Sequence, residues 1–369
     1  MKTRPRRILH VGPVPKLPAG GIAAYLLGLL QAPWPEGYAF RAVNTYVPAW
    51  CMRFRILRPL YTLAIVARLL PQLWVWRPAI VHIHSSDFTG FWEKGVLLWM
   101  CRAAGCRTVM HLHGGSFELF LQGLGPRAGE LARRIFARSD RIIVLSRAWC
   151  PTVARFAPRG KLDVVPNAIE TAAFAPPDPA PVRDGARLLF LGMLSARKGM
   201  QQLQDALLTL MDVPWTLDVV GGDEGAGERV RWEAAYRAAG LAGRVRFWGP
   251  LYGADKLRLL HTDGIFVLPS LSESFGIANL EAMAAGMAVV STRVGAIPEY
   301  IDHGVQGLLV PPGDARALAA ALRLFLGDAG LRARCGAAAR VRAQDFDWTR
   351  VVQQLMDVYT AALGSRHES

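Results

Sequence analysis

Two glutamates, Glu273 and Glu281, stand on either side of Gly276 in a segment whose residue types suit the binding of a phosphorylated sugar. A strand pattern ending at Pro269 passes through the loop SLSESFG into a helical pattern near Ile277. We therefore expect Glu273 in the loop and Glu281 on the helix. Glu281 would then lie about five residues, or roughly 7.5 Å, along the helix axis.

The start of such a helix attracts a phosphate, because its N–H groups are free and the helix dipole is positive there. A glycine lets the backbone approach closely. Carboxylates on either side can accept hydrogen bonds from hydroxyl groups. A nucleotide-sugar, which is a diphosphate with a sugar on each side, would use the helix start, the glycine and both carboxylates. Either glutamate alone could be a solvated side chain, but the setting E-x-F-G-x-x-x-x-E, followed by A-M-A-A-G, is hard to produce by accident.

Histidines end two of the expected strands. His111 and His113 lie in MHLHGGSF, and because side chains alternate along a strand, both project from the same face. His113 directly precedes a glycine pair and is our candidate for a residue that faces a ligand. We expect His111, and His82 in the segment VHIHSS, to be half-buried strand histidines.

Short apolar runs alternate with helical patterns along the chain, which is typical of parallel sheets wound with helices. The expected strands are residues 7–11, 40–45, 80–84, 108–113 and 141–146, and then 188–191, 216–220, 245–248, 265–268, 289–291 and 307–310. Between the two sets, FAPPDPAPV contains five prolines, which remove backbone donors and disfavour helix and sheet alike. The pattern predicts an α/β protein of two Rossmann-like, doubly wound parallel-sheet domains, with ligands bound in the cleft between them. The predicted domains are residues 1–173 and 183–345, joined by a linker at 174–182.

The formal charge of +14 is concentrated in the first half, where residues 1–170 carry a net +15 and seven of the eleven tryptophans. Arginine with amphipathic aromatic side chains suits an anionic membrane surface, but nucleic acid would attract the same charge, and solvated arginines on helix faces would explain it equally well. Five scattered cysteines show no paired or metal-binding spacing, which fits a reducing cytoplasm. We expect no signal peptide and no transmembrane helix, because arginine and proline interrupt the apolar stretch at residues 56–83.

The sequence resembles the retaining family 4 glycosyltransferases of the GT-B fold, the glycosyl transferases group 1 that build bacterial polysaccharide and lipopolysaccharide. The glutamate segment matches the E-x7-E motif of this family. Upstream, FLGMLSARKG at 190–199 is similar to its phosphate-binding turn, VPNAI at 165–169 to the entry into its second domain, and RFWGPL at 246–251 to its base-binding strand and loop.

The resemblance implies roles for individual residues. Glu273 would hold hydroxyls of the donor sugar, Glu281 would hold the ribose hydroxyls, and Lys198 would neutralise the diphosphate as the leaving group gains charge. The expected catalytic residues are His113, Glu273 and Lys198. The expected donor-binding residues are Gly20, Gly21, Arg197, Lys198, Trp248, Gly249, Leu251, Glu273, Phe275, Gly276, Ile277, Ala278 and Glu281. Ser85, Ser86 and Asp87 follow a strand and could touch the acceptor.

Two features need separate interpretation. The family usually has arginine directly after the glycine of the phosphate-binding turn, where this sequence has Met193, and Arg197 could take over that role. Asp345 and Asp347 form a D-x-D, which binds a metal in the other major glycosyltransferase fold. Here it lies far in sequence from any strand end, so we expect Asp347 to be an N-cap of the helix at 346–369, which in this family returns to the first domain. We expect no metal and no cofactor.

The resemblance implies retaining transfer by front-face attack, in which the donor phosphate takes the acceptor proton. Double displacement would need a second suitably placed carboxylate, and the sequence offers no acidic pair near His113. The expected partners are a UDP- or GDP-sugar, a glycan or lipid-linked acceptor, and the anionic inner face of the cytoplasmic membrane, to which a cytoplasmic enzyme would bind peripherally. The residues expected at that surface are Arg53, Arg55, Leu57, Arg58, Leu60, Arg68, Leu69, Trp74 and Trp76.

Three other classes remain as alternatives. A nucleotide-sugar-binding scaffold or regulatory protein of an envelope assembly, without transferase activity, is favoured only by Met193. A nucleic-acid binder would explain the charge, but the sequence shows no helix-turn-helix, RNP or zinc motif. A dinucleotide oxidoreductase is disfavoured because neither half opens with G-x-G-x-x-G.

Overall fold

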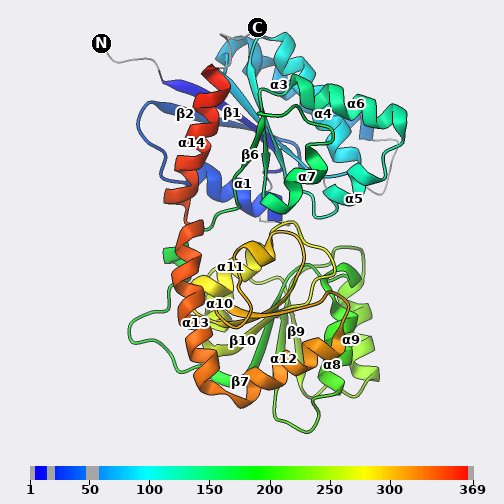
Figure 1. Ribbon diagram of the computed structural model, residues 1–369, viewed down its shortest axis with the longest axis vertical. Helices are drawn as coiled ribbons and strands as arrows, with labels where there is room; N and C mark the ends of the chain where they lie inside the picture. The colour runs from blue at the N-terminus through cyan, green and yellow to red at the C-terminus, as the bar shows by residue number, and fades with distance from the viewer. Residues whose placement is uncertain (1–4, 15–20, 47–57, 365–369) are drawn as a thin grey trace. The chain divides into compact units, whose positions relative to one another are not determined.

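The computed structural model describes residues 5–14, 21–46 and 58–364 (Figure 1). The chain divides into two compact units, each with its own sheet. The first unit comprises residues 1–168 and 348–369, and the second comprises residues 169–347. The proline-rich segment at 174–182 therefore belongs to the second unit, and the chain crosses between units at 168–169 and 347–348.

The first unit contains a six-stranded parallel sheet in the order β2-β1-β3-β4-β5-β6. Its strands are β1 (Arg6–Gly12), β2 (Tyr38–Asn44), β3 (Ile80–Ser85), β4 (Arg107–Leu112), β5 (Arg141–Val144) and β6 (Leu162–Val164). The five strands predicted in this half are confirmed, and the three-residue β6 was not predicted.

Helices cover both faces of this sheet. They are α1 (Gly21–Gln31), α3 (Arg58–Pro71), η2 (Gln72–Trp76), α4 (Thr89–Ala103), α5 (Phe117–Gln122), α6 (Pro126–Arg138), η3 (Arg147–Trp149), α7 (Cys150–Val153) and α14 (Trp348–Gly364). The carboxyl-terminal helix α14, red in Figure 1, packs against β3, β4 and β5. Its first residue, Trp348, packs against Tyr25 of α1 with the two rings tilted, and Gly28 leaves the space that the indole fills.

The two faces of the first sheet differ in chemistry because side chains alternate along each strand. One face carries the apolar core, in which Leu9, Val81 and Met110 are fully buried. The alternate positions carry buried histidines from β1, β3 and β4, which contact tyrosines of α1 and α14.

The second unit contains a six-stranded parallel sheet in the order β12-β11-β10-β7-β8-β9. Its strands are β7 (Asp184–Leu191), β8 (Thr216–Val220), β9 (Val245–Gly249), β10 (Asp263–Leu268), β11 (Ala288–Thr292) and β12 (Gly307–Val310). All six predicted strands are confirmed. The strand order reverses between β7 and β10, and ligands of doubly wound sheets bind beyond the carboxyl ends of the strands at such a point.

The helices of the second unit are η4 (Thr171–Phe174), η5 (Ala196–Lys198), α8 (Met200–Leu208), α9 (Glu228–Ala238), α10 (Gly253–Thr262), α11 (Ile277–Ala284), η6 (Ile297–Glu299), α12 (Ala315–Gly327), α13 (Ala329–Ala343) and η7 (Gln344–Phe346). None of the helices in the described part of the chain combines the length and the apolar character that a membrane crossing requires.

Candidate functional site

The loop after β10 leads into α11, as the sequence predicted. Gly276 is the N-cap of this helix and has a φ of +81°, in the left-handed region that glycine adopts without strain. A side chain there would also approach Tyr300 Oη to 3.1 Å. No acidic residue lies in the first turn of α11. The N–H of Asn279 donates to the Gly276 carbonyl at 2.9 Å, whereas the N–H groups of Ile277 and Ala278 precede the hydrogen-bond ladder of the helix. This end of α11 therefore offers donors and a positive dipole to an anion.

Lys198 and Glu273 meet at the point where the strand order reverses. Lys198 follows β7 in η5, Glu273 lies in the loop after β10, and the Lys198 ammonium forms an ion pair with the Glu273 carboxylate. Their side chains are only 12% and 10% exposed, so little water screens the pair. The residue after Lys198 must be a glycine, because a Cβ at Gly199 would lie 1.9 Å from the carbonyl oxygen of Pro269.

Glu281 has a lysine partner of its own. Its Oε1 lies 3.0 Å from Nζ of Lys256, which belongs to α10. Lys256 was not predicted, although the chain has only six lysines, and two of these pair with the two glutamates of the motif. Each carboxylate is thus held by one cation from a different element.

Arg197 bridges two loops of the second unit. Its guanidinium donates to the carbonyl of Ser272 at 3.1 Å and to the Glu224 carboxylate at 2.6 Å. The N–H of Leu271 in turn donates to the Arg197 carbonyl at 2.8 Å. Arg197 therefore fixes the loop that carries Glu273, and it would have to share its guanidinium with Glu224 to bind a phosphate.

The loop after β9 contains the residues expected near a nucleotide base. Trp248 donates from its indole N–H to Asp218 at 2.6 Å, and the Arg246 guanidinium lies 3.4 Å from the centroid of its ring. Gly249 ends β9 with a φ of +74°, and Leu251 follows half-buried. The Trp248 ring is thus covered within the second unit, which leaves the backbone of this loop as the part that a base could contact.

Phe275 packs inward from the loop before α11. Its side chain is 2% exposed and stacks on Tyr300 at 5.2 Å between ring centroids, while the Tyr300 hydroxyl donates to the Phe275 carbonyl at 2.6 Å. Asn279 also donates to the Tyr300 hydroxyl. The predicted donor residue Phe275 therefore supports the loop through its ring and can meet a ligand only through its backbone.

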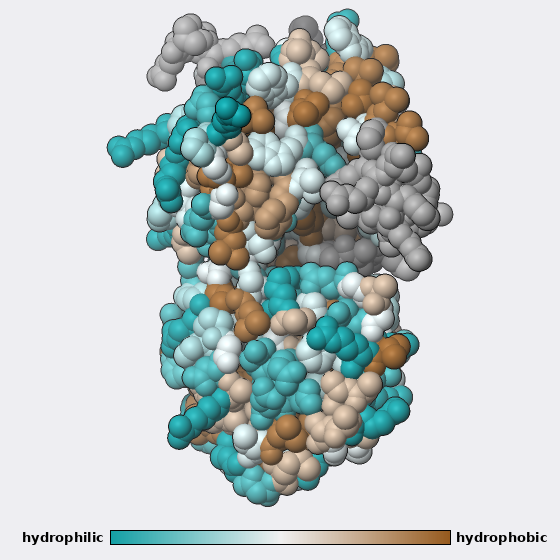
Figure 2. Space-filling model, turned by 90° about the vertical axis from the view of Figure 1, so that its right-hand side faces the viewer, coloured by the Kyte–Doolittle hydropathy of each residue, from teal (hydrophilic) through white to brown (hydrophobic). Residues whose placement is uncertain are grey.

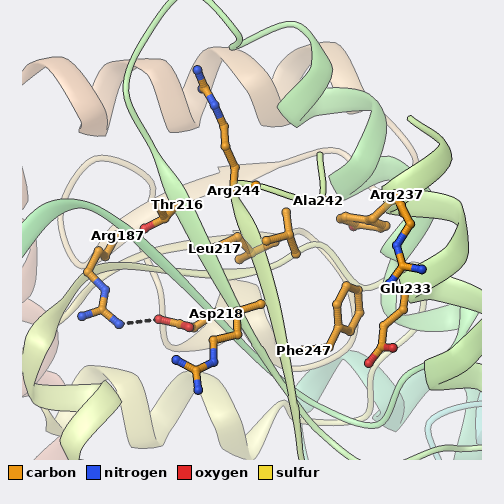
Figure 3. A pocket seen from close by; sticks show the side chains of 13 residues that line it. Arg187, Thr216, Leu217, Asp218, Glu233, Arg237, Ala242, Arg244 and Phe247 are labelled. Carbon is orange, nitrogen blue, oxygen red and sulfur yellow. Dashed lines mark hydrogen bonds and ion pairs between the residues drawn. The ribbon is translucent and has the colours of Figure 1, made fainter. Parts of the chain in front are cut away.

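A surface cavity of about 570 Å³ lies elsewhere in the second unit, at the amino ends of its strands (Figure 3). Figure 3 shows Arg187 paired with Asp218 on one side, and Glu233 and Arg237 of α9 on the other, beside Phe247. None of the predicted donor residues lines this cavity.

The histidines of the first unit are more buried than predicted. His82 and His111 are fully buried instead of half-buried, because α14 and α1 cover the sheet face on which they lie. His113 is 4% exposed, and its Nε2 lies 3.0 Å from Nδ1 of His84. Burial lowers the pKa of His113 and of His10 to about 3 and holds those of the other three well below the usual value, so all five imidazoles are neutral.

The residues expected to meet an acceptor are tied to their own loop. Ser85 is buried and donates to the carbonyl of Ser86 at 2.9 Å. The carboxylate of Asp87 accepts from the N–H of Ser116 at 3.0 Å and lies against Gly114, next to His113. Asp87 therefore orders the turn that follows His113.

The remaining predicted residues are placed as follows. Gly21 begins α1, and Gly20 lies outside the described residues. In the D-x-D sequence, Asp345 forms an ion pair with Arg342, and Asp347 accepts from the N–H and hydroxyl of Thr171. The two carboxylates are therefore bound to separate partners.

An apolar stripe is exposed on α3 and η2 of the first unit. It consists of Leu60, Leu63, Leu70, Trp74 and Val75, which are 39–81% exposed. The opposite side of the same helix, including Leu69, is buried in the core, so the expected surface role of Leu69 is wrong. Trp76 is half-buried beneath Arg41, while Arg53, Arg55 and Leu57 lie outside the described residues.

Comparison with known proteins identifies the family. Residues 16–173 match Glycosyltransferase Family 4, and residues 175–342 match Glycosyl transferases group 1. A phosphatidyl-myo-inositol mannosyltransferase of Mycobacterium leprae is 35% identical over 299 residues, which cover 78% of this chain and 75% of the relative. A protein of the same name from Mycolicibacterium smegmatis is 39% identical over 212 residues, covering 54% of this chain and 52% of the relative, so the chain spans about half of that relative's length.

The fold agrees with solved structures. HepE from Anabaena, determined in complex with UDP, superposes with a TM-score of 0.75 at 21% identity and covers 96% of this chain and 100% of its own. The two Rossmann-like units are those of the GT-B fold. The chain belongs to glycosyltransferase family 4.

Proposed function

We propose that the protein is a retaining glycosyltransferase that moves a sugar from a nucleotide-diphosphate-sugar to a glycan or lipid-linked acceptor. The observation that carries the proposal is the pair of glutamates, one in the loop before α11 and one within that helix, each held by a lysine from another element. This arrangement offers N–H donors and cations to a diphosphate, and carboxylates to the hydroxyls of the sugars that flank it.

In the proposed reaction, Lys198 and the first N–H groups of α11 stabilise the diphosphate as the glycosidic bond breaks and negative charge builds on it. Glu273 holds the sugar hydroxyls. Lys198 already neutralises Glu273 in the free protein, and a bound diphosphate would give the same ammonium a second anionic partner. The acceptor hydroxyl attacks the face from which the diphosphate leaves, and a phosphate oxygen of the leaving group takes its proton. This route retains the configuration and requires no metal, and we propose that His113 contacts the transferred sugar.

A lipid-linked acceptor fits the surface of the first unit. Brown side chains gather over the upper part of this unit in Figure 2, and the apolar stripe on α3 and η2 contributes large exposed side chains. Arg68 lies exposed on α3, and Arg77 is exposed directly after η2. Apolar side chains beside arginines suit an anionic bilayer surface. The two mycobacterial relatives carry names that specify a phosphatidylinositol acceptor, which is itself a lipid. We therefore propose a cytoplasmic enzyme that docks on the inner membrane and serves polysaccharide or lipopolysaccharide synthesis.

The proposal is tested by single-turnover transfer from radiolabelled UDP- and GDP-sugars to a membrane lipid extract. Wild-type protein should label one lipid or glycan fraction. Glu273→Gln should lower transfer by about 10²–10³-fold while nucleotide binding persists. Glu233→Gln, on the surface of α9 in the same unit, is the matched control and should transfer at the wild-type rate. Full transfer by Glu273→Gln with intact nucleotide binding would refute the assignment.

A scaffold that binds nucleotide-sugar without transferring it remains the second candidate. The observation that favours it is Met193, which leaves the phosphate-binding turn without its usual arginine, while Arg197 is occupied by Glu224. Nucleotide binding with no labelled product from any donor would select this candidate.

A further inference from the structure

Five of the eight histidines of the chain form one buried cluster in the first unit. His10 comes from β1, His82 and His84 from β3, and His111 from β4, with His113 directly after it. The parallel register places His10 beside His82 and His84 beside His111, so all five rings share one face of the sheet. Each is at most 4% exposed.

The rings form two hydrogen-bonded chains. In one, Nε2 of His84 lies 3.2 Å from His10, and its Nδ1 lies 3.0 Å from His113. In the other, Nδ1 of His82 lies 2.7 Å from the Tyr359 hydroxyl, and its Nε2 lies 3.2 Å from His111. Both nitrogens of His82 and of His84 are therefore used, and a ligand on Nδ1 of His84 would replace its hydrogen bond to His113.

The ends of these chains are not satisfied. Nε2 of His10, Nε2 of His111 and Nδ1 of His113 have no hydrogen-bond partner within the described structure, and neither does the hydroxyl of Tyr25. A neutral imidazole has one donor and one acceptor, so whichever way the chain through His84 is oriented, one terminal N–H is buried without an acceptor. Such a buried N–H is unfavourable. A terminal nitrogen that carries no proton instead keeps a lone pair that no donor uses, and Nε2 of His111 and Nδ1 of His113 can each offer one to a cation.

One ring nitrogen each of His84, His111 and His113 lies within 4.8 Å of the other two. We propose that these three imidazoles bind one divalent transition-metal ion of the zinc class. Imidazole suits zinc, copper and nickel, whereas magnesium and calcium require oxygen ligands. The segments H-I-H and H-L-H on adjacent strands supply three nitrogen ligands, as in zinc sites that keep a fourth position open.

The other histidines support this choice of ligands. A metal-bound imidazole usually donates its second N–H to a neighbouring group, which fixes the ring. His111 can donate to His82, which in turn can donate to the Tyr359 hydroxyl, and His84 can donate to His10. In the alternative group of His10, His82 and His84, a metal on one nitrogen of His82 would break its bond to Tyr359 or to His111, whereas the proposed group keeps both of these bonds and gives up the one between His84 and His113.

Two further features fit a metal. Gly12 ends β1 against His84, and a Cβ there would come within 3.1 Å of the Cβ of His84, so glycine keeps space around this ligand. The Tyr25 ring lies 5.0–5.9 Å from the rings of all three ligands, and its unpaired hydroxyl is available to a water on the metal. A metal on the ring of His113 leaves the main-chain carbonyl of this residue free to contact a sugar. The metal site is therefore compatible with the proposed transfer reaction, and the proposal of the site does not depend on that reaction.

The test is a titration of the intact chain, freed of any polyhistidine tag and dialysed against chelator, with Co²⁺ and then Zn²⁺. We expect one equivalent of Co²⁺ with the visible absorption of a four- or five-coordinate nitrogen site, displaced by Zn²⁺. His111→Gln and His113→Gln should each weaken Zn²⁺ binding at least about 100-fold. His261→Gln, a histidine of the second unit that lies outside the cluster, should leave it unchanged.

X-ray absorption at the zinc edge of the wild-type protein keeps the test valid even where a variant fails to fold. Three imidazole nitrogens at about 2.0–2.1 Å are expected. Sulfur in the coordination sphere, no binding at 100-fold molar excess of Zn²⁺, or a greater loss in His10→Gln than in His113→Gln would each overturn the assignment.

Discussion

Lys198 and Glu273 form an ion pair at the carboxyl ends of β7 and β10, although 75 residues separate them in the chain. The adjacency of the two strands creates the pair, and Gly199 allows the turn that carries the lysine to approach the loop that carries the glutamate. In the proposed reaction this lysine meets the leaving diphosphate.

Loss of the Lys198 ammonium should slow transfer more than it weakens binding. Lys198→Gln removes a cation from the position where charge builds up, and we expect kcat to fall by about 10²–10³-fold. Arg229→Gln removes a half-exposed cation of the same unit and should have little effect. An unchanged kcat for Lys198→Gln would exclude the lysine from the chemical step.

Close backbone contact makes Gly295 indispensable. Its φ is +54°, and a Cβ there would lie 2.0 Å from the carbonyl oxygen of Glu273. Gly295→Ala should therefore displace the Glu273 loop and abolish nucleotide binding, measured by titration calorimetry. Gly313→Ala is the matched control, because Gly313 also has a positive φ but open space around it. Equal effects of the two substitutions would show that backbone strain, and not the contact with Glu273, is responsible.

The Tyr300 hydroxyl holds the same loop from behind. Tyr300→Phe keeps the stacking on Phe275 but loses the hydrogen bonds to its carbonyl and to Asn279, all within a buried region. We expect the free energy of unfolding in urea to fall by about 1–3 kcal/mol. Tyr252→Phe, at an exposed position, should change it by less than about 0.5 kcal/mol. Equal stability of Tyr300→Phe and wild type would contradict a supporting role for this hydroxyl.

Asp263 makes stability depend on pH. Burial raises its pKa to about 7, above that of an exposed aspartate, so between about pH 4 and 7 the folded state binds more protons than the unfolded state. Stability attributable to Asp263 therefore falls as pH rises through this range, by at most about 1.4 kcal/mol per pH unit. Asp263→Asn should be more stable than wild type at pH 8 and similar to it at pH 4. Thermal unfolding of both proteins at pH 4 and pH 8 measures this difference in stability. A variant that is less stable than wild type at pH 8 would refute the account.

The apolar stripe should govern membrane binding. Leu63→Gln combined with Trp74→Gln removes two of its exposed side chains, and we expect several-fold less protein to sediment with anionic liposomes at low salt. Val341→Gln, exposed on α13 of the second unit, is the control. If wild-type protein does not sediment with these liposomes, the docking proposal fails.

Local sequence patterns were sufficient to predict the strands, the start of α11 and the loop position of Glu273. They missed β6 because its three residues, Leu162–Val164, are too short to show a pattern, and its Asp163 is held by Arg141 of β5. Lys256 was missed because its proximity to Glu281 depends on how α10 packs and not on spacing along the chain.

Burial was harder to predict than strand position. His82 and His111 alternate with apolar residues as half-exposed strand residues would, but α14, which follows them by more than 200 residues, covers their face of the sheet. Leu69 and Leu70 are adjacent apolar residues on one helix, yet only the packing of α3 against the core distinguishes the buried one from the exposed one.

The most direct test of the central claim is a thermal-shift panel of UDP, GDP, ADP and their common sugar conjugates with the wild-type protein and Glu281→Gln. A nucleotide at about 100 times its dissociation constant stabilises the folded state by roughly 2.7 kcal/mol. We predict that one nucleotide raises the Tm of the wild type, and that the shift is largely lost in Glu281→Gln. No shift with any nucleotide, or an equal shift in the variant, would contradict a donor site at the amino end of α11.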